Sequence, residues 1–178
     1  MSELQRALAA LERGDVDGGR RGLQDLANSG DVLAGARLAD SLMRQAPADL
    51  DGALRWYRWA AVSGDPEAAA TLAAAYFEGR GVARDPGEAV RWYRQAAAAG
   101  IPEAQRALGL MHLLGDGVAA DPVAARGWFV RATALHDRPA AYNLGRMYER
   151  GEGVQADAAA AARWYAEAAT PPGAVPEA

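Results

Sequence analysis

The sequence predicts an all-α protein, an α-solenoid of about five helix-turn-helix pairs. The first observation is that the segment 65–100 returns at 101–136 and again from residue 137 onward. A pattern that recurs at this spacing is typical of repeat architectures. The second observation is that every copy holds two apolar runs at helical spacing with glycines between them. One such pair cannot bury both of its faces, whereas stacked copies can.

The first helix of each pair carries one apolar stripe. Ala68, Leu72 and Tyr76 are spaced by four residues, which places them on the same helix face. Ala73 is small enough to allow a neighbouring helix to approach. The glycines at 79 and 81 predict the end of this helix, because a C-terminal cap favours a residue that tolerates positive φ. The equivalent residues of the later copies are Leu108, His112, Gly115, Gly117, Leu144, Tyr148, Gly151 and Gly153.

The second helix of each pair begins with a capping signal. Asp85 and Pro86 predict an N-cap followed by a proline in the first turn, and Glu88 fits a capping box. Trp92 and Tyr93 then form the large part of the inward face. The same signals recur as Asp121 with Trp128-Phe129 and as Asp157 with Trp164-Tyr165. These acids are therefore expected to be caps, not a catalytic carboxylate pair.

These patterns predict one domain over residues 1–170, followed by a flexible tail at 171–178. The expected pairs are 1–30, 31–64, 65–100, 101–136 and 137–170. The first pair is degenerate, with Asp15 as a cap and Gly18, Gly19 and Gly22 where later pairs carry larger residues, so it is expected to cap the stack. The second pair is two residues shorter than the next two pairs, and the missing residues belong to the loop between its helices, where a change of length affects stability least.

The composition excludes several classes of site. The chain has no cysteine and no lysine, which excludes thiolate nucleophiles, zinc–thiolate clusters and a Walker lysine. With only two histidines no multi-histidine metal site can form; His112 is expected to be half-buried and hydrogen-bonded, and His136 to suit a helix C-terminus. We therefore expect no enzyme, no cofactor and no metal.

The charge pattern also limits the expected partners. The net charge of -4 is mild and its two signs are interspersed, so neither a nucleic-acid nor a membrane partner is indicated. Residues 1–12 carry no signal-peptide core and no membrane span. We expect a cytoplasmic protein.

The three Gly-x-Gly-Val turns, the capping acids and the Trp-aromatic pairs resemble the Sel-one-like repeat (SLR) family, a relative of the tetratricopeptide repeat. The resemblance covers about residues 31–170. It implies a right-handed α/α superhelix that acts as a scaffold, with a concave surface that holds a peptide or a protein.

The resemblance also implies where partner-binding residues would lie, because the first helix of each pair lines the concave face of such stacks. The sixth, tenth and thirteenth places of each pair are outside the core stripe. Those that could contact a partner are Asp40, Met43, Phe77, Arg106, Leu110, Leu113, Tyr142, Arg146 and Glu149. Apolar residues flanked by arginines suit a segment with apolar anchors and a carboxylate. The alternative is that Phe77, Leu110 and Leu113 only fill contacts between neighbouring repeats.

Trp59 is a possible second surface, since the matching places carry Gln95, Arg131 and Glu167. We expect it to cover the thin region left by Gly19 and Gly22, with an exposed partner anchor as the alternative.

The expected function is a non-catalytic adaptor that binds another protein. Two alternatives stay open: an immunity or inhibitor protein that blocks a toxin or enzyme, and a self-assembling unit that forms a homodimer through its C-terminal end.

Overall fold

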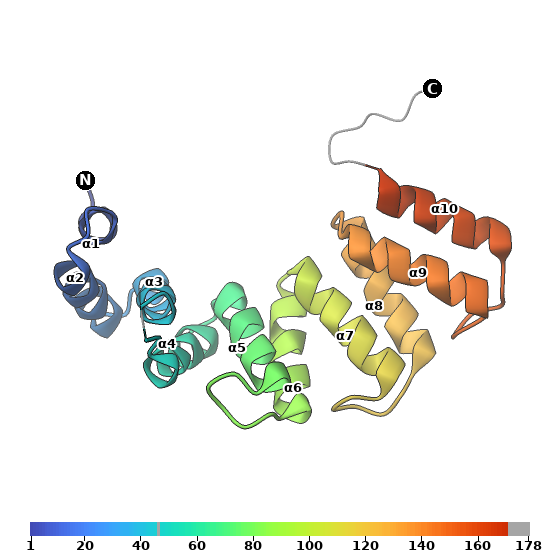
Figure 1. Cartoon of the computed structure of the whole chain (residues 1–178), viewed down its shortest axis with the longest axis horizontal. Coiled ribbons are helices and arrows are strands. Elements are labelled where there is room, and N and C mark those ends of the chain that lie inside the picture. Colours follow the sequence, from blue (N-terminus) through green and yellow to red (C-terminus); the bar gives the residue numbers. More distant parts are fainter. Residues whose placement is uncertain (46, 171–178) are drawn as a thin grey trace. The chain divides into compact units, whose positions relative to one another are not determined.

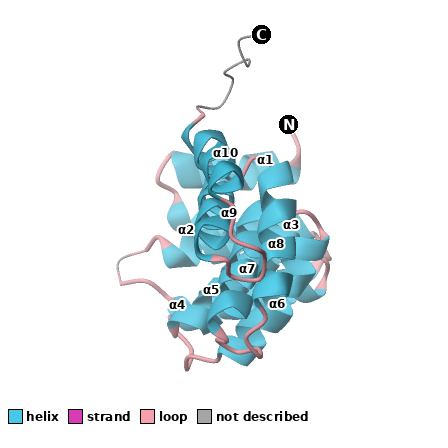
Figure 2. Cartoon of the chain, turned by 90° about the vertical axis from the view of Figure 1, so that its right-hand side faces the viewer, coloured by secondary structure: helices cyan, strands magenta, loops and turns pink. Residues whose placement is uncertain are grey.

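The computed structural model describes residues 1–45 and 47–170, and over these residues the secondary structure consists of ten α-helices (Figures 1 and 2). Each predicted pair contains two of them. The fold class predicted from the sequence, an all-α helical-repeat superhelix, is therefore confirmed. The helices are α1 (Glu3–Glu12), α2 (Val16–Asn28), α3 (Val32–Met43), α4 (Leu50–Val62), α5 (Pro66–Glu78), α6 (Pro86–Ala98), α7 (Pro102–Leu114), α8 (Pro122–Ala134), α9 (Arg138–Arg150) and α10 (Ala158–Ala169).

The chain forms two compact units, Met1–Asp85 and Pro86–Ala178. The boundary falls inside the third predicted pair, between α5 and α6. Within each unit every helix packs against the next one along the chain. The single domain over 1–170 stays a prediction, and the expected flexible tail lies outside the described residues.

Close approach between the two helices of a pair depends on a small residue. A Cβ atom on Gly109 of α7 would lie 2.5 Å from Phe129 of α8, and one on Gly145 of α9 would lie 2.5 Å from Tyr165 of α10. The aromatic ring of the second helix therefore rests on the backbone of the first. Ala73 occupies the same place in its repeat and was expected to allow a neighbouring helix to approach. The contact with the ring explains why these three positions carry only alanine or glycine.

The two glycines of each turn have different roles. Gly115 and Gly151 end α7 and α9 in the left-handed conformation, with φ of 72° and 71°. Gly117 and Gly153 also have positive φ, and in addition each lies against the start of an earlier second helix: a Cβ atom would come within 2.3 Å of the Pro86 carbonyl oxygen or 2.5 Å of that of Pro122. The second glycine thus brings the turn into contact with the preceding repeat.

The capping acids occupy the predicted places. The carboxylates of Asp121 and Asp157 accept hydrogen bonds from the backbone N–H groups of Ala124 and Ala160, each at 2.9 Å. Asp15 caps α2 in the same way, which confirms that the degenerate first pair forms two helices.

His136 is the one residue other than glycine with a left-handed backbone among the described residues, at φ 63°. It occupies the place of Gly30, Gly64 and Gly100, all of which also have positive φ. The sequence predicts a helix end at this residue. In the structure this end has a left-handed backbone conformation, which is less favourable for histidine than for glycine.

Candidate functional site

The predicted apolar residues of α7 lie against the core. Leu110 and Leu113 are half-buried and pack on a cluster that contains Phe129, Leu144 and Met147. This placement is the one expected if they fill contacts between neighbouring repeats. They contribute only part of their surface to any partner.

Arg106 is engaged inside the chain. Its Nε donates a hydrogen bond to Oδ2 of Asp137 at 3.0 Å, and the Asp137 side chain is only 5% exposed. The other oxygen, Oδ1, accepts from the N–H of Ala140 at 2.8 Å and caps α9. Arg106 therefore supports the start of α9, and the carboxylate that it binds belongs to its own chain.

Three predicted residues lie together on α9, and we call Tyr142, Arg146 and Glu149 the α9 patch; Tyr142 and Glu149 are exposed and Arg146 is half-buried. Tyr142 is 52% exposed, and the centroid of its ring lies 5.4 Å from that of Tyr165. The hydroxyl of Tyr165 donates to Oε2 of Glu149 at 2.9 Å. Desolvation, followed by this hydrogen bond, raises the pKa of Tyr165. Arg146 has no hydrogen-bond or ion-pair partner among the described residues, so its guanidinium is available to a carboxylate.

The predicted residues of the first unit have internal contacts. Asp40 accepts hydrogen bonds from the Tyr57 hydroxyl at 2.6 Å and from Arg37 at 3.1 Å. Burial and the bond to Asp40 raise the pKa of Tyr57. Met43 lines a cavity of about 50 Å³, too small for more than a water or two.

Phe77 is also half-buried. The guanidinium carbon of Arg84 lies 5.4 Å from the centroid of its ring. This distance is within the range of a cation–π contact.

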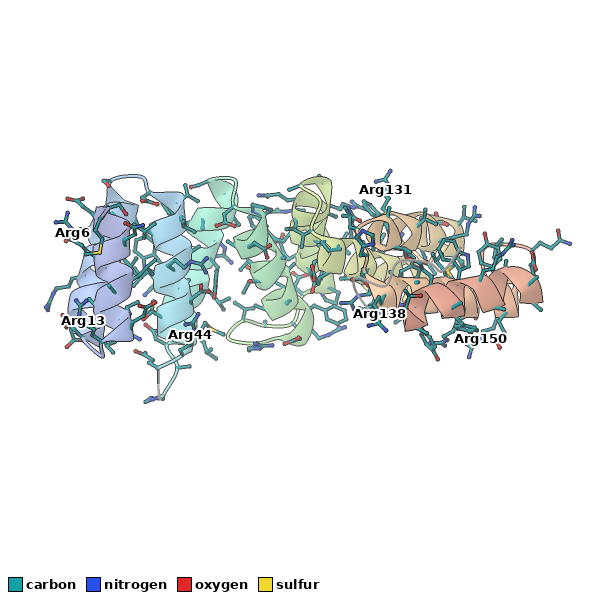
Figure 3. The ribbon with its side chains drawn as sticks, turned by 90° about the horizontal axis from the view of Figure 1, so that it is seen from above. Arg6, Arg13, Arg44, Arg131, Arg138 and Arg150 are labelled. Atoms are coloured by element: carbon teal, nitrogen blue, oxygen red, sulfur yellow. The ribbon has the colours of Figure 1, made fainter. Side chains whose placement is uncertain are left out.

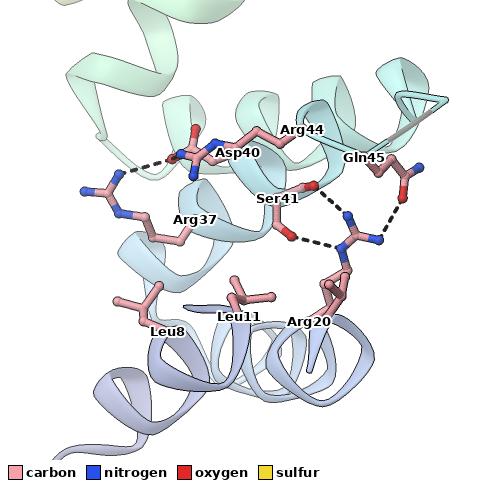
Figure 4. Close-up of a pocket in the computed structure, with 9 residues that line it drawn as sticks. Leu8, Leu11, Arg20, Arg37, Asp40, Ser41, Arg44 and Gln45 are labelled. Carbon is pink, nitrogen blue, oxygen red and sulfur yellow. Dashed lines mark hydrogen bonds and ion pairs between the residues drawn. The ribbon is translucent and has the colours of Figure 1, made fainter. Parts of the chain in front are cut away.

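A pocket of about 280 Å³ lies between α1, α2 and α3, and we call it the α1–α3 pocket (Figure 4). Leu8 and Leu11 of α1 lie on one side, and Arg37, Asp40 and Arg44 of α3 lie on the other. Arg44 projects from the C-terminal end of α3, and its side chain is 79% exposed (Figure 3). The pocket combines an apolar floor with a cationic wall.

Arg20 forms the end of this pocket and joins α2 to α3. Its guanidinium donates to Oγ and to the backbone carbonyl of Ser41 at 2.9 Å and 2.6 Å, and to Oε1 of Gln45 at 2.7 Å. Because Ser41 lies in the last turn of α3, Arg20 also satisfies one of the free carbonyls of that helix end.

Of the residues that line this pocket, only Asp40 is predicted from the sequence as a partner-binding residue. A usable signal was present, since Arg37, Asp40 and Arg44 are spaced by three and four residues and so share one face of α3. The contribution of α1 and α2 had no such signal, because it depends on how the first pair packs on the second.

The expectation for Trp59 is wrong in its contact. Its ring lies over Gly35 of α3, where a Cβ atom would come within 2.4 Å, and it meets Trp56 edge to face at 5.7 Å. Ala7 of α1 lies nearest to Gly22. Gly19 is buried beneath Leu11 of α1, whereas Gly22 lines a hollow of about 680 Å³ between α1 and α2. Trp59 packs against a buried cluster that joins the first two pairs and includes Ala27 of α2 and Leu38 of α3.

The expectation for His112 is correct in burial and wrong in bonding. The residue is half-buried, but its Nδ1 atom is buried without a hydrogen-bond partner. No group of three or more histidine, aspartate or glutamate side chains that could hold a metal ion is present among residues 1–45 and 47–170. Within the same part of the chain, no helix has the length and apolar character needed to cross a membrane.

The sequence matches the Sel1 repeat family model four times, at residues 36–65, 66–101, 102–137 and 138–170. These matches coincide, within a few residues at each end, with the four later helix pairs, and they leave out the degenerate first pair. No curated protein matches the sequence.

Solved structures show the same fold. A protective antigen of uropathogenic Escherichia coli with an SLR fold is 34% identical, with a TM-score of 0.81 over 84% of this chain and 32% of the antigen. A Sel1 repeat protein from Oxalobacter formigenes is 28% identical, with a TM-score of 0.80 over 85% of this chain and 63% of that protein. An immunity protein from Pseudomonas aeruginosa shares the fold alone, at 20% identity and a TM-score of 0.52 over 84% of this chain and 56% of the immunity protein. The chain spans about a third of the length of the first of these proteins and just under two thirds of the second.

Proposed function

Since this chain belongs to the Sel1 repeat family, we propose that it is a non-catalytic scaffold that binds a segment of another protein along the first helices of its pairs. Proteins of this family are typically interaction scaffolds. The proposal assigns the first helices the binding role and the second helices the role of support.

The observation that carries the proposal is the α9 patch. An exposed tyrosine ring lies one helical turn from an arginine that has no partner in the described chain. Tyrosine and arginine are the residue types enriched at the energetic centres of interfaces, because each combines apolar area with directed hydrogen bonds. The ring of Tyr165 packs against both the Tyr142 ring and the backbone at Gly145. These contacts support the patch, so a partner would bind a preformed surface.

Affinity capture from the native cell lysate tests this proposal. The intact chain is compared with a variant carrying Tyr142→Ala and Arg146→Glu. The matched control carries Val130→Ala and Arg163→Glu, which make the same kind of change at exposed positions of second helices in the same unit. Circular dichroism first verifies that all three chains have the same helix content.

We expect a partner retained by the intact chain and by the control and reduced at least tenfold on the patch variant. Equal retention by the patch variant would overturn the proposal. The two narrower alternatives are distinguished by further measurements. An inhibitor would retain an enzyme or toxin whose activity falls on binding, and a self-assembling unit would show a mass that rises with its own concentration in light scattering.

A further inference from the structure

The α1–α3 pocket has the size of a site for side chains. Sites for drug-sized molecules and cofactors occupy roughly 300 to 1,000 Å³, whereas a cavity of about 150 Å³ holds one benzene ring. At about 280 Å³ this pocket lies at the lower end of the first range and has room for one or two side chains. Its dimensions favour a protruding part of a polypeptide.

The charge of the lining is opposite to that of the chain. The pocket is lined by three guanidinium groups, Arg20, Arg37 and Arg44, and by one carboxylate, Asp40, a local charge of +2. The whole chain carries -4. Electrostatic complementarity therefore favours an acidic occupant.

Two of these arginines, Arg37 and Arg44, have guanidinium N–H groups that are not used in hydrogen bonds within the described part of the chain. Arg37 donates one hydrogen bond to Asp40 and its side chain is 50% exposed. Arg44 lies 3.9 Å from Asp40, beyond hydrogen-bond distance, and is more exposed still. Asp40 is already occupied by Tyr57 and Arg37, so it leaves most of the guanidinium donors free. A guanidinium with free donors can bind a carboxylate through two parallel hydrogen bonds.

The pocket is held in place without a ligand. Three hydrogen bonds fix Arg20 to the end of α3. Leu8 and Leu11 are fixed at their inner ends by packing on a cluster that includes Leu23 and Leu38. A preformed site loses less conformational entropy on binding than one that must be ordered.

From these observations we propose that the α1–α3 pocket binds an acidic, apolar segment of another protein. An aliphatic side chain would contact Leu8 and Leu11, and an aspartate or glutamate within two residues of it would bind Arg37 and Arg44. This inference rests on the proposed scaffold function and names the chemistry of one segment that the scaffold binds. Nucleic acid is the less suitable occupant, because its phosphates would leave the leucine floor without an apolar contact.

The test is a selection from a phage-displayed library of random peptides on three forms of the chain. The first is the intact protein. The pocket variant carries Arg37→Glu and Arg44→Glu. The control carries Arg21→Glu and Arg55→Glu, two exposed arginines of the same unit that do not line the pocket, so the change in net charge is identical.

We expect the intact protein and the control to enrich peptides in which an aliphatic residue lies within two residues of an acid, and the pocket variant to lose them. Fluorescence anisotropy with one enriched peptide should give at least tenfold weaker binding to the pocket variant and at most a twofold change for the control. Replacing the glutamates of that peptide by glutamines should weaken binding to the intact protein about equally.

Four results would overturn the inference: no enrichment of any peptide, enrichment without acids, equal loss on the control, or tighter binding of a labelled single-stranded oligonucleotide than of the peptide. A second variant, Val16→Glu, guards against loss of folding. It adds a negative charge at the pocket edge, in the first turn of α2, where an acid is compatible with the helix. It should also reject the peptide. If no acidic peptide binds the α1–α3 pocket while the α9 patch variant still loses the native partner in the affinity capture, this inference is wrong and the proposed function stands.

Discussion

Replacing Gly117 by alanine should destabilise the second unit by about 1–4.5 kcal/mol. The left-handed backbone, at φ 76°, costs an alanine about 1–2 kcal/mol. The new Cβ atom would also lie 2.3 Å from the Pro86 carbonyl oxygen, and relieving such a contact by moving backbone costs about 1–3 kcal/mol. The lower conformational freedom of alanine in the unfolded chain offsets roughly 0.5–1 kcal/mol of the sum.

Two other glycines of the same unit separate these contributions. Gly100 has φ of 90°, and no atom lies within 4 Å of the place that a Cβ atom would take, so Gly100→Ala measures the backbone and unfolded-chain contributions without a steric contact and should cost about 0–1.5 kcal/mol. Gly127 lies inside α8 with open space around it, and Gly127→Ala should stabilise by about 0.5–1 kcal/mol.

Urea unfolding followed by circular dichroism at a helix wavelength measures all three free energies of unfolding. The reasoning predicts the order Gly127→Ala, wild type, Gly100→Ala, Gly117→Ala, from most to least stable. If Gly117→Ala costs no more than Gly100→Ala, the second glycine of the turn is not needed for contact with the preceding repeat.

Three further predictions concern single side chains. Arg20→Ala should lower the free energy of unfolding by about 2–3 kcal/mol in urea titrations, because three half-buried hydrogen bonds to Ser41 and Gln45 are lost; a change under about 0.5 kcal/mol would contradict this. Tyr57 has a raised pKa in the folded state, so its contribution to stability is complete below its usual value of 10.0 and is lost as the pH rises above it. The urea midpoint should therefore fall more steeply above pH 10 in the wild type than in Tyr57→Phe, and parallel curves would refute the assignment. His136→Gly should raise the free energy of unfolding by up to about 1 kcal/mol, and with it the thermal midpoint, because glycine adopts the left-handed backbone conformation without the strain that histidine has there. A lower thermal midpoint would show that the contacts of the imidazole contribute more than the strain costs.

Most of the fold could be predicted because its determinants are close together in the sequence. A cap such as Asp121 acts on a backbone group three residues away, and the glycine at 115 ends its helix by its own backbone conformation. The recurrence of these signals gave the number of pairs and their limits. The choice of first helices as the candidate binding surface followed from the resemblance that the same signals carry.

The contacts of the candidate residues could not be predicted, because they join residues far apart in the sequence. Arg106 has the same position in its repeat as Tyr142, yet it bonds to Asp137 across 31 residues, while Tyr142 stays exposed. Trp59 was expected over Gly19 and Gly22 and lies over Gly35 instead, since the packing of α4 on α3 decides its neighbour.

The sequence by itself determined the helices, their ends and their pairing, because hydrogen bonds and caps within a repeat depend on neighbouring residues. The tertiary structure alone decided which arginines are available to a partner. Arg146 has no hydrogen-bond or ion-pair partner within the described chain, although Glu149 lies on the same helix. Arg37 and Arg44 line a pocket together with leucines of α1 because the first pair packs against α3. Such availability depends on distances between helices, which the order of residues along one helix does not contain.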